Sequence, residues 1–358
     1  MVRPVRGGVP GGAGLTPHAA LPVRRARAQL LTPGTRDPCD VVGRLVAVQA
    51  QDWRSARLAL RARSDGLTTD ALDAAAADGS LVVSWLLRGT LHLVRAEDHG
   101  WLLGFTARAG MVQSRRRLAE EGVTEPQVDT ALRVITSGPA DGARSRQELT
   151  DQLAAAGVPV AGQAVYHCLR LAALHGRAVL VPGAEAGSLL VRAIYPPAAP
   201  TDRDAAVVEL ARRYLRGHGP ATAADLAAWS GLPLRDARAG LRGLGAALVE
   251  CADGLVDLAC RDAAGGDVPG VPPRLLPPFD PFLLGWADRS FAVPEHLRSR
   301  VHPGGGMLRA IATVDGAVVG TWTLRRRDGR PEVALDVAEP AHVAALALDV
   351  ADVLRFSG

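Results

Sequence analysis

The chain has 358 residues with a formal charge of +4, apolar residues make up 48% of it, and all 41 of its basic side chains are arginines. Because the sequence contains no lysine, no side chain can form a Schiff base or serve as the lysine of a phosphate-binding P-loop. The aromatic content of 4% disfavours a stacking platform for single-stranded nucleic acid.

The first 22 residues differ in composition from the rest. Residues 1–22 are rich in glycine, proline and arginine and lack the apolar run of a signal peptide, so we expect a flexible leader. No apolar run in the chain is long enough to cross a membrane. The four cysteines form no CxxC pair and the nine histidines are scattered, so we expect free thiols, no metal site and a cytoplasmic protein.

Residues 23–121 predict a first winged helix-turn-helix unit with its connecting helices. Asp37 and Thr68 are typical N-cap residues, and apolar side chains recur at helical spacing after Asp37. Two apolar runs separated by Arg88-Gly89 predict the strands of a wing. The helices are expected at 24–31, from residue 38 onward, at 55–62, at 69–77 and over 97–121, and the strands at 81–87 and 90–94.

The same order, helices followed by two strands, recurs over residues 122–198 and 199–266, which predict a second and a third winged unit. Asp253-Gly254 in the third unit is a typical hairpin dipeptide. The second unit has expected helices at 125–136, 146–156 and 162–174 and strands at 178–181 and 189–194. The third has expected helices at 205–215, 223–229 and 234–244 and strands at 247–251 and 255–258.

The pattern changes after a segment rich in proline and glycine at 268–278. Residues 267–358 predict a small β-barrel-like module with a C-terminal helix, which makes the whole chain an α+β protein. The run Gly304-Gly305-Gly306 lacks the strand–helix context of a phosphate-binding turn, so we interpret it as a loop. The strands are expected at 307–314, 317–326 and 332–337, and the closing helix at 340–354.

The most distinctive polar side chains follow the second predicted helix. If that helix continued, Gln49 and Gln51 would point about 200° apart, whereas an extended chain would place both on one face. Paired carboxamides offer donors and acceptors without adding charge, which suits holding a water against a developing cation. Two glutamines at a helix end can equally be solvated. Asp52 could activate that water, cap the next helix or pair with Arg54.

A second polar cluster lies in the first predicted wing. His92 is in the middle of an apolar alternation. It is either a core histidine bonded to the backbone or a group that orients a glutamine or a water, with Thr90 as a further supporting candidate. Arg88, at the turn of the wing, either contacts phosphate or is solvated.

Three stretches in this order resemble the winged-helix DNA glycosylases of the AlkZ type, and the resemblance covers about residues 24–358. They are residues 49–53 (Gln-Ala-Gln-Asp-Trp), 88–92 (Arg-Gly-Thr-Leu-His) and 276–289, from Leu276 to Arg289. The resemblance implies removal of N7-alkylated purines from duplex DNA. Members include self-resistance enzymes of antibiotic-producing bacteria that excise bulky adducts and unhook interstrand crosslinks. Gln49 and Gln51 match the family's catalytic Gln-hydrophobe-Gln, whose second Gln is Asp in a related branch.

This implied reaction is chemically consistent with the residues. An N7-alkylguanine is already cationic, so the enzyme needs no general acid and has only to stabilise an oxocarbenium-like sugar and place a water. Strand cleavage by a glycosylase proceeds through a Schiff base, usually on a lysine, so a chain without lysine is expected to be monofunctional. No cofactor is expected. We expect a bacterial monomer that joins the nucleoid when it binds DNA.

DNA binding would then depend mainly on arginine. The basic turn at 325–330 can reach into a groove while its flanking strands hold it. If Arg326 contacts phosphate, Arg326→Ala should weaken binding evenly and lower the salt slope by about one. Any of these arginines can instead belong to a solvated face. The candidate DNA-binding residues are Trp53, Arg54, Arg57, Arg88, Arg325, Arg326, Arg327 and Arg330.

Two other functions fit the same sequence. A non-catalytic winged-helix regulator would bind a specific DNA sequence and release no base, and winged helices alone cannot exclude this. A protein that sequesters a genotoxin would bind the free drug in the absence of DNA. Base release from an alkylated duplex separates the glycosylase from both.

Overall fold

The computed structural model describes residues 21–32, 34–137, 142–183, 188–194, 202–259 and 270–358. The predicted leader lies outside these ranges except for its last two residues, which begin the first helix. Cys260 is also outside them, and the other three cysteines are free thiols. No helix in the described ranges is long and apolar enough to cross a membrane.

The first unit follows the predicted order of helices and strands. Both expected caps are confirmed, because the Asp37 side chain accepts a hydrogen bond from the Cys39 N–H and Thr68 accepts one from the Ala71 N–H. Its elements are α1 (Leu21–Ala28), α2 (Pro38–Leu45), α3 (Trp53–Arg61), α4 (Thr69–Ala77), β2 (Leu81–Leu86), the single turn η1 (Leu87–Gly89) and β3 (Thr90–Arg95).

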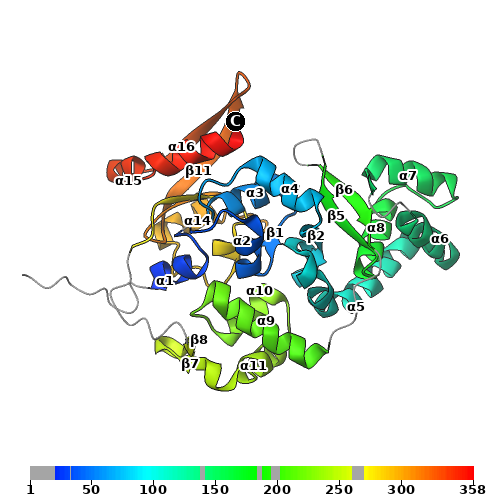
Figure 1. Ribbon diagram of the computed structural model, residues 1–358, viewed down its shortest axis with the longest axis horizontal. Helices are drawn as coiled ribbons and strands as arrows, with labels where there is room; N and C mark the ends of the chain where they lie inside the picture. Colours follow the sequence, from blue (N-terminus) through cyan, green and yellow to red (C-terminus); the bar gives the residue numbers. More distant parts are fainter. Residues whose placement is uncertain (1–20, 33, 138–141, 184–187, 195–201, 260–269) are drawn as a thin grey trace, which may run out of the picture.

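The hairpins predicted as the wings of the first and second units join into one six-stranded antiparallel sheet, in the order β1-β3-β2-β5-β6-β4. Val83 on β2 pairs with Leu180 on β5, and this contact links the two units (Figure 1). A short strand that the sequence did not predict adds to each edge. The strands not yet named are β1 (Val48–Gln49), β4 (Ala143–Arg144), β5 (Ala178–Pro182) and β6 (Leu189–Ala193).

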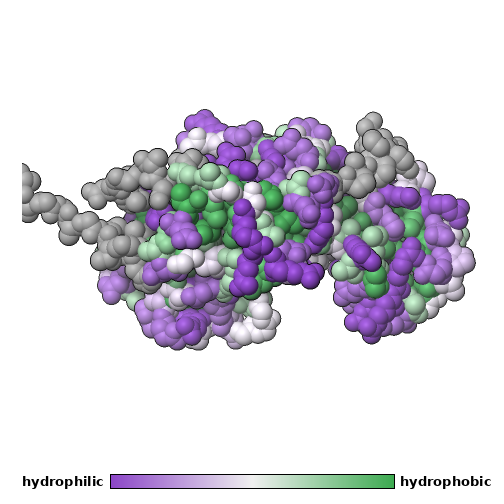
Figure 2. All heavy atoms as spheres, turned by 90° about the horizontal axis from the view of Figure 1, so that it is seen from below, coloured by the Kyte–Doolittle hydropathy of each residue, from purple (hydrophilic) through white to green (hydrophobic). Residues whose placement is uncertain are grey.

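Helices cover this sheet, and another group of helices forms the third unit. The connection between the first two units is a single long helix, α5, which packs against β2 and α8. The second unit stands apart as a lobe in Figure 2, with an indentation between it and the rest of the molecule. The connecting helix is α5 (Ala96–Glu120), and the helices of the second unit are α6 (Glu125–Thr136), α7 (Arg146–Ala155) and α8 (Ala164–Leu174). The third unit has α9 (Arg203–His218), α10 (Ala223–Ser230), α11 (Leu234–Arg242) and the hairpin β7 (Leu248–Glu250) and β8 (Val256–Leu258).

The C-terminal module is an open sheet, so the expected β-barrel-like closure is wrong. Its four antiparallel strands have the order β12-β11-β10-β9, and the two outer strands do not pair with each other. Helix α16 packs against both outer strands and covers the sheet instead. Its elements are β9 (Arg274–Leu276), α13 (Pro281–Leu284), η4 (Glu295–Leu297), α14 (Arg298–Val301), β10 (Ile311–Val314), β11 (Ala317–Arg327), β12 (Arg330–Val337), α15 (Pro340–Ala345) and α16 (Ala347–Ser357).

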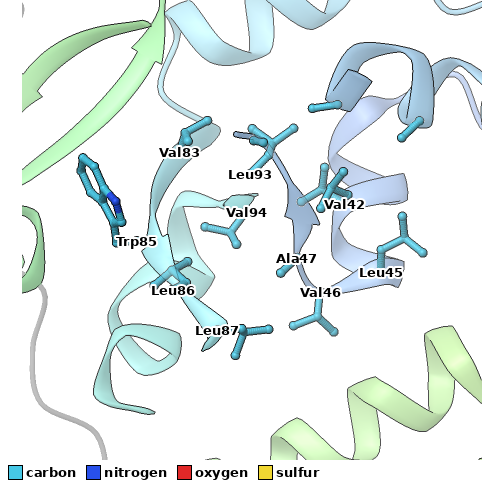
Figure 3. Packing of buried hydrophobic residues seen from close by; sticks show 14 of the residues in the cluster. Val42, Leu45, Val46, Ala47, Val83, Trp85, Leu86, Leu87, Leu93 and Val94 are labelled. Carbon is cyan, nitrogen blue, oxygen red and sulfur yellow. The ribbon is translucent and has the colours of Figure 1, made fainter. Parts of the chain in front are cut away.

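One continuous apolar core joins helix α2 to the six-stranded sheet. Val42 and Leu45 of α2 and Leu86 and Leu93 of the sheet are each fully buried and lie close together (Figure 3). Burying a side chain of this size stabilises a fold by about 1.5–3 kcal/mol. The core therefore holds β1, which carries Gln49, rigidly against β3.

Candidate active site

Gln49 and Gln51 lie on an extended segment that adds to the edge of the sheet. Helix α2 ends at Val46, whose positive φ of 69° breaks the helix. β1 then pairs Gln49 with His92, and the Ala50 N–H donates to the Leu91 carbonyl at 2.9 Å. The chain is therefore extended at this point, and the Gln49 side-chain amide donates to the Gln51 side-chain oxygen at 3.0 Å.

This contact leaves a specific set of groups available to a ligand. Gln49 is half-buried and Gln51 is exposed. The bond uses one N–H of Gln49 and one lone pair of Gln51, so the Gln49 oxygen and both N–H groups of Gln51 remain. Together they can accept a hydrogen bond from a water and donate one to it without adding charge.

Asp52 is the N-cap of α3. Its Oδ1 accepts from the Arg54 backbone N–H at 3.1 Å, and its Oδ2 accepts from the Ser55 hydroxyl at 2.6 Å. Both carboxylate oxygens thus hold the start of the helix. The structure thus confirms the capping role among those left open for Asp52.

A pair of substitutions separates capping from catalysis at this position. Asp52→Asn keeps a good N-cap and removes the charge, so it should leave both stability and the rate of base release nearly unchanged. Asp52→Ala removes the cap and should cost about 1 kcal/mol of unfolding free energy. Urea denaturation and a single-turnover base-release assay measure the two effects. A large loss of rate in Asp52→Asn would instead make the carboxylate part of the reaction.

His92 is a buried, neutral histidine next to Gln49. It is 2% exposed, and its Nδ1–H donates to the Thr90 carbonyl at 3.0 Å. Burial, with a smaller contribution from the charge of Arg88, lowers the pKa of His92 to about 3. His92 therefore fits the core histidine that the sequence left open, and it cannot act as a general acid near neutral pH. The Thr90 hydroxyl donates to the Leu87 carbonyl and helps to shape the turn.

The register of the sheet still connects His92 to the glutamine pair. Directly opposed residues on antiparallel strands share one face, so Gln49, His92 and Ser84 form a row across β1, β3 and β2. Ser84 is fully buried, and its hydroxyl has no hydrogen-bond partner among the described residues. The row gives Gln49 a rigid, uncharged neighbourhood on its sheet side.

A cavity of about 350 Å³ opens beside Gln49. Arg88 of the wing turn lines it, together with Arg289 and His302 from the C-terminal module. Burial is the main cause that lowers the pKa values of all three basic side chains. The cavity thus combines the glutamine with a strongly basic, partly desolvated wall.

A larger groove of about 1220 Å³ runs next to this cavity, between the start of α3 and the hairpin of β11 and β12. Asp52 and Arg54 line it on one side, and Arg325 lines it on the other. Met307 and Leu308 line both the groove and the smaller cavity. Gln49 therefore lines a small cavity that shares Met307 and Leu308 with an extended basic groove.

Some of the predicted DNA-binding residues do not lie free on this surface. Trp53 is 3% exposed and packs in the core, so its predicted DNA contact is wrong. Arg57 pairs with Asp73 at 3.6 Å and lies over the Phe356 ring. Arg326 donates to the Gly329 and Ser357 carbonyls at 2.8 and 2.9 Å, which fixes the hairpin to the end of α16.

Other predicted residues are better placed for DNA. Arg54 and Arg325 line the groove, and Arg88 lines the cavity. Arg325, Arg327 and Arg330 are exposed, and their side chains form no hydrogen bond or ion pair with a described residue. The hairpin that carries them projects from the body of the molecule in Figure 1.

The sequence and the overall fold of this chain are matched in known proteins. A family model described as "DNA glycosylase AlkZ-like" matches residues 42–356. The chain belongs to the AlkZ-like DNA glycosylase family. It is 32% identical over 327 residues, 84% of this chain and 86% of the relative, to an interstrand DNA cross-link repair glycosylase of Streptomyces sahachiroi. The solved structure of the DNA glycosylase AlkZ from the same organism matches it with a TM-score of 0.76 at 26% identity, over 95% of this chain and 96% of that one.

Sequence reasoning missed part of the cavity of this AlkZ-like chain. Arg289 lay within the stretch 276–289 that carried the family resemblance, but nothing in that stretch distinguished it from a solvated arginine. His302 stood alone in the sequence, without a partner of its own type. Both reach Gln49 only through the packing of the C-terminal module against the first unit.

Proposed function

We propose that this AlkZ-like protein is a monofunctional DNA glycosylase that hydrolyses the N-glycosidic bond of cationic N7-alkylguanine adducts in duplex DNA. Bulky genotoxin adducts, including interstrand crosslinks of the kind named for the Streptomyces relative, are its proposed substrates. The observation that carries the proposal is the hydrogen-bonded pair of Gln49 and Gln51, because Gln49 lines a cavity that adjoins a basic groove. Its proposed setting is antibiotic self-resistance and base excision repair by a monomer in the bacterial cytoplasm.

The proposed reaction needs only the groups that the glutamine pair offers. The C1′–N9 bond breaks and its electron pair goes to the cationic base, which leaves as a neutral purine. The sugar becomes oxocarbenium-like. The Gln49 side-chain oxygen, which the bond to Gln51 does not use, can stabilise this sugar and orient a water without adding charge. The water oxygen bonds to C1′ and its proton passes to solvent. An undamaged purine is not released, because nothing protonates it.

The proposed product is an intact abasic site. A lyase reaction requires an amine that forms a Schiff base with the sugar, and this chain has no lysine side chain. Borohydride should therefore trap no covalent protein–DNA adduct during the reaction. A trapped adduct that goes on to strand cleavage would contradict this part of the proposal.

The proposed DNA-binding scaffold is the set of three winged helix-turn-helix units at 23–121, 122–198 and 199–266, with the sheet module at 267–358. Helices followed by an antiparallel hairpin occur in each unit, and this order supports the assignment. The hairpin of β11 and β12 is proposed to contact the duplex backbone. Its arginines are exposed beside the groove that leads to Gln49.

The hairpin contact predicts different behaviour for two neighbouring arginines. Arg325→Ala should weaken duplex binding about evenly across sequences and lower the salt slope by about one, because a phosphate contact is lost. Arg326→Ala is the matched control and should leave the slope unchanged, since the Arg326 guanidinium already donates to two carbonyl oxygens. Fluorescence anisotropy over a salt series measures both slopes. Equal slopes for wild type and Arg325→Ala would exclude this phosphate contact.

One assay separates the three candidate functions. The protein is mixed with a duplex that carries a single N7-alkylguanine, the products are treated with alkali, and cleavage at the lesion is measured. A glycosylase gives cleavage only after alkali treatment. A regulator gives a footprint on one undamaged sequence and no cleavage. A sequestering protein binds the free alkylating drug and leaves the duplex intact.

A further inference from the structure

The cavity beside Gln49 contains a concentration of positive charge, which the charge of Asp288 offsets at Arg289 but not at Arg88. Arg88 and Arg289 both line it, and neither forms an ion pair with a described acidic side chain. Besides burial, the cause that lowers the pKa of Arg88 is the charge of Arg289, and the charge of Arg289 also lowers that of His302. Three basic groups thus face one another across a small, partly desolvated space.

Both arginines are fixed in place by the backbone of neighbouring elements. An Arg88 N–H donates to the Trp229 carbonyl near the end of α10, and the Arg289 Nε–H donates to the Leu283 carbonyl. The backbone of Gly231, with φ of 80°, approaches Arg88 closely. A Cβ at this position would lie only 3.2 Å from the Arg88 backbone nitrogen. Each guanidinium keeps further N–H groups for a ligand. The wall is therefore preorganised.

The rest of the cavity wall favours an anion. Phe279 and Leu284 supply apolar surface, which strengthens electrostatic attraction by excluding water. Gly304 and Gly306 also line the cavity, and no described residue accepts a hydrogen bond from their backbone N–H groups. The three glycines at 304–306 all have positive φ, between 60° and 105°, which other residues rarely adopt. This loop leaves its backbone open beside the two arginines.

The charge of the cavity decides which part of an alkylated nucleotide fits. A cationic N7-alkylguanine would be repelled by two arginines that form no ion pair with a described carboxylate. A phosphodiester would be attracted, and guanidinium groups bind it with paired hydrogen bonds. The phosphate next to a nucleotide is also joined through its sugar to C1′, the atom that the reaction attacks.

We infer that the cavity formed by Arg88, Arg289 and the 304–306 loop binds one phosphodiester of the damaged strand next to the lesion. This contact holds the deoxyribose so that C1′ lies at Gln49. The inference rests on the proposed glycosylase function and deepens it, because it names the group of the substrate that fixes the reacting sugar. Arg88 and Arg289 are then binding residues that act on the rate through position.

A scan with neutral phosphates tests this inference. Each of the phosphates on either side of a single N7-alkylguanine is replaced in turn by a methylphosphonate, and single-turnover base release is measured. With wild-type protein, one position should lose on the order of 10- to 100-fold in rate, and the others much less. With Arg289→Gln, the unmodified duplex should already be slow, and a methylphosphonate at that one position should cost nothing more.

The control and the contradicting outcomes are equally specific. Arg116→Gln, at an exposed arginine on α5 that pairs with Glu120, should leave the sensitive position as it is in wild type. The inference is wrong if no single position stands out with wild-type protein, or if the Arg289→Gln and methylphosphonate losses simply multiply. It is also wrong if Arg289→Gln changes the preference between adducts instead, because the cavity would then hold the base. Melting temperatures show whether Arg289→Gln is folded, and the wild-type scan remains decisive if it is not.

Failure of the proposed function gives a different result. Wild-type protein would then release no base even from the unmodified duplex. The same methylphosphonate duplexes are in that case compared by equilibrium binding. Loss of affinity at one position, cancelled in Arg289→Gln, would still assign the phosphate to this cavity.

Discussion

Gln49→Ala should lower the single-turnover rate of base release by roughly 10²- to 10³-fold while leaving duplex affinity almost unchanged. Removing one preorganised group that stabilises a transition state costs about this much in other enzymes. Gln49 is half-buried and lines the cavity, and it contributes no charge to DNA binding. The measurement is alkali-revealed cleavage of an N7-alkylguanine duplex under single-turnover conditions, with affinity measured separately by anisotropy.

The second glutamine makes the test sharper. Because the Gln49 amide donates to the Gln51 oxygen, Gln51→Ala should lower the rate too, and the double variant should lose less than the product of the two single losses. Gln147→Ala is the matched control, since Gln147 is an exposed glutamine on α7 that bonds only to Asp151 among the described residues. Normal cleavage by the double variant would remove the glutamine pair from the mechanism.

Local signals predicted most of the elements. The predicted bounds of α4 and α6 agree with the structure to the residue, and for α4 the Thr68 side chain, which accepts from the Ala71 N–H, fixes where the helix begins. The wing of β2 and β3 was predicted from its apolar runs. These features depend on neighbours a few residues apart, so the sequence contains them directly.

Long-range pairing could not be predicted in the same way. The contact of Val83 with Leu180 joins two wings that are about 100 residues apart, and no local pattern distinguishes it from two separate hairpins. The two-residue strand β1 is too short to give a period of two. The C-terminal strands alternate as barrel strands do, but their closure depends on edges that α16 covers instead.

In the candidate site, too, the local part could be predicted from the sequence and the part that depends on long-range packing could not. Gln49 and Gln51 stand two residues apart, so an extended chain was enough to bring them together. Arg289 lies 240 residues after Gln49, and only the packing of the C-terminal module against the first unit brings it to the cavity. The contacts that hold these two parts together are therefore as important for the site as the glutamines.

Arg63→Ala should destabilise the protein by about 3–5 kcal/mol, because it leaves a buried carboxylate without a partner. Arg63 and Asp280 are both fully buried and form two hydrogen bonds of 2.7 and 2.9 Å between them. Arg63 also donates to Gln29 at 2.7 Å, and Asp280 accepts from the Phe282 N–H at the start of α13. The pair thus ties α1 and α3 to the module that carries Arg289.

Urea denaturation of matched variants measures this effect. Arg116→Ala, which removes an exposed pair with Glu120 on α5, should barely change the midpoint. The double change Arg63→Met with Asp280→Leu should recover part of the loss, because it leaves no unpaired buried charge. If Arg63→Ala were as mild as Arg116→Ala, this pair would not be what holds the two parts together.

The same substitution connects stability to the reaction. Asp280 directly follows Phe279, which lines the cavity with a positive φ of 56° and so depends on its surroundings to hold that conformation. Arg63→Ala should therefore slow base release even at temperatures where the variant is folded, through displacement of the cavity wall. A folded Arg63→Ala protein with a normal rate would show that Phe279 and Arg289 are held by other contacts.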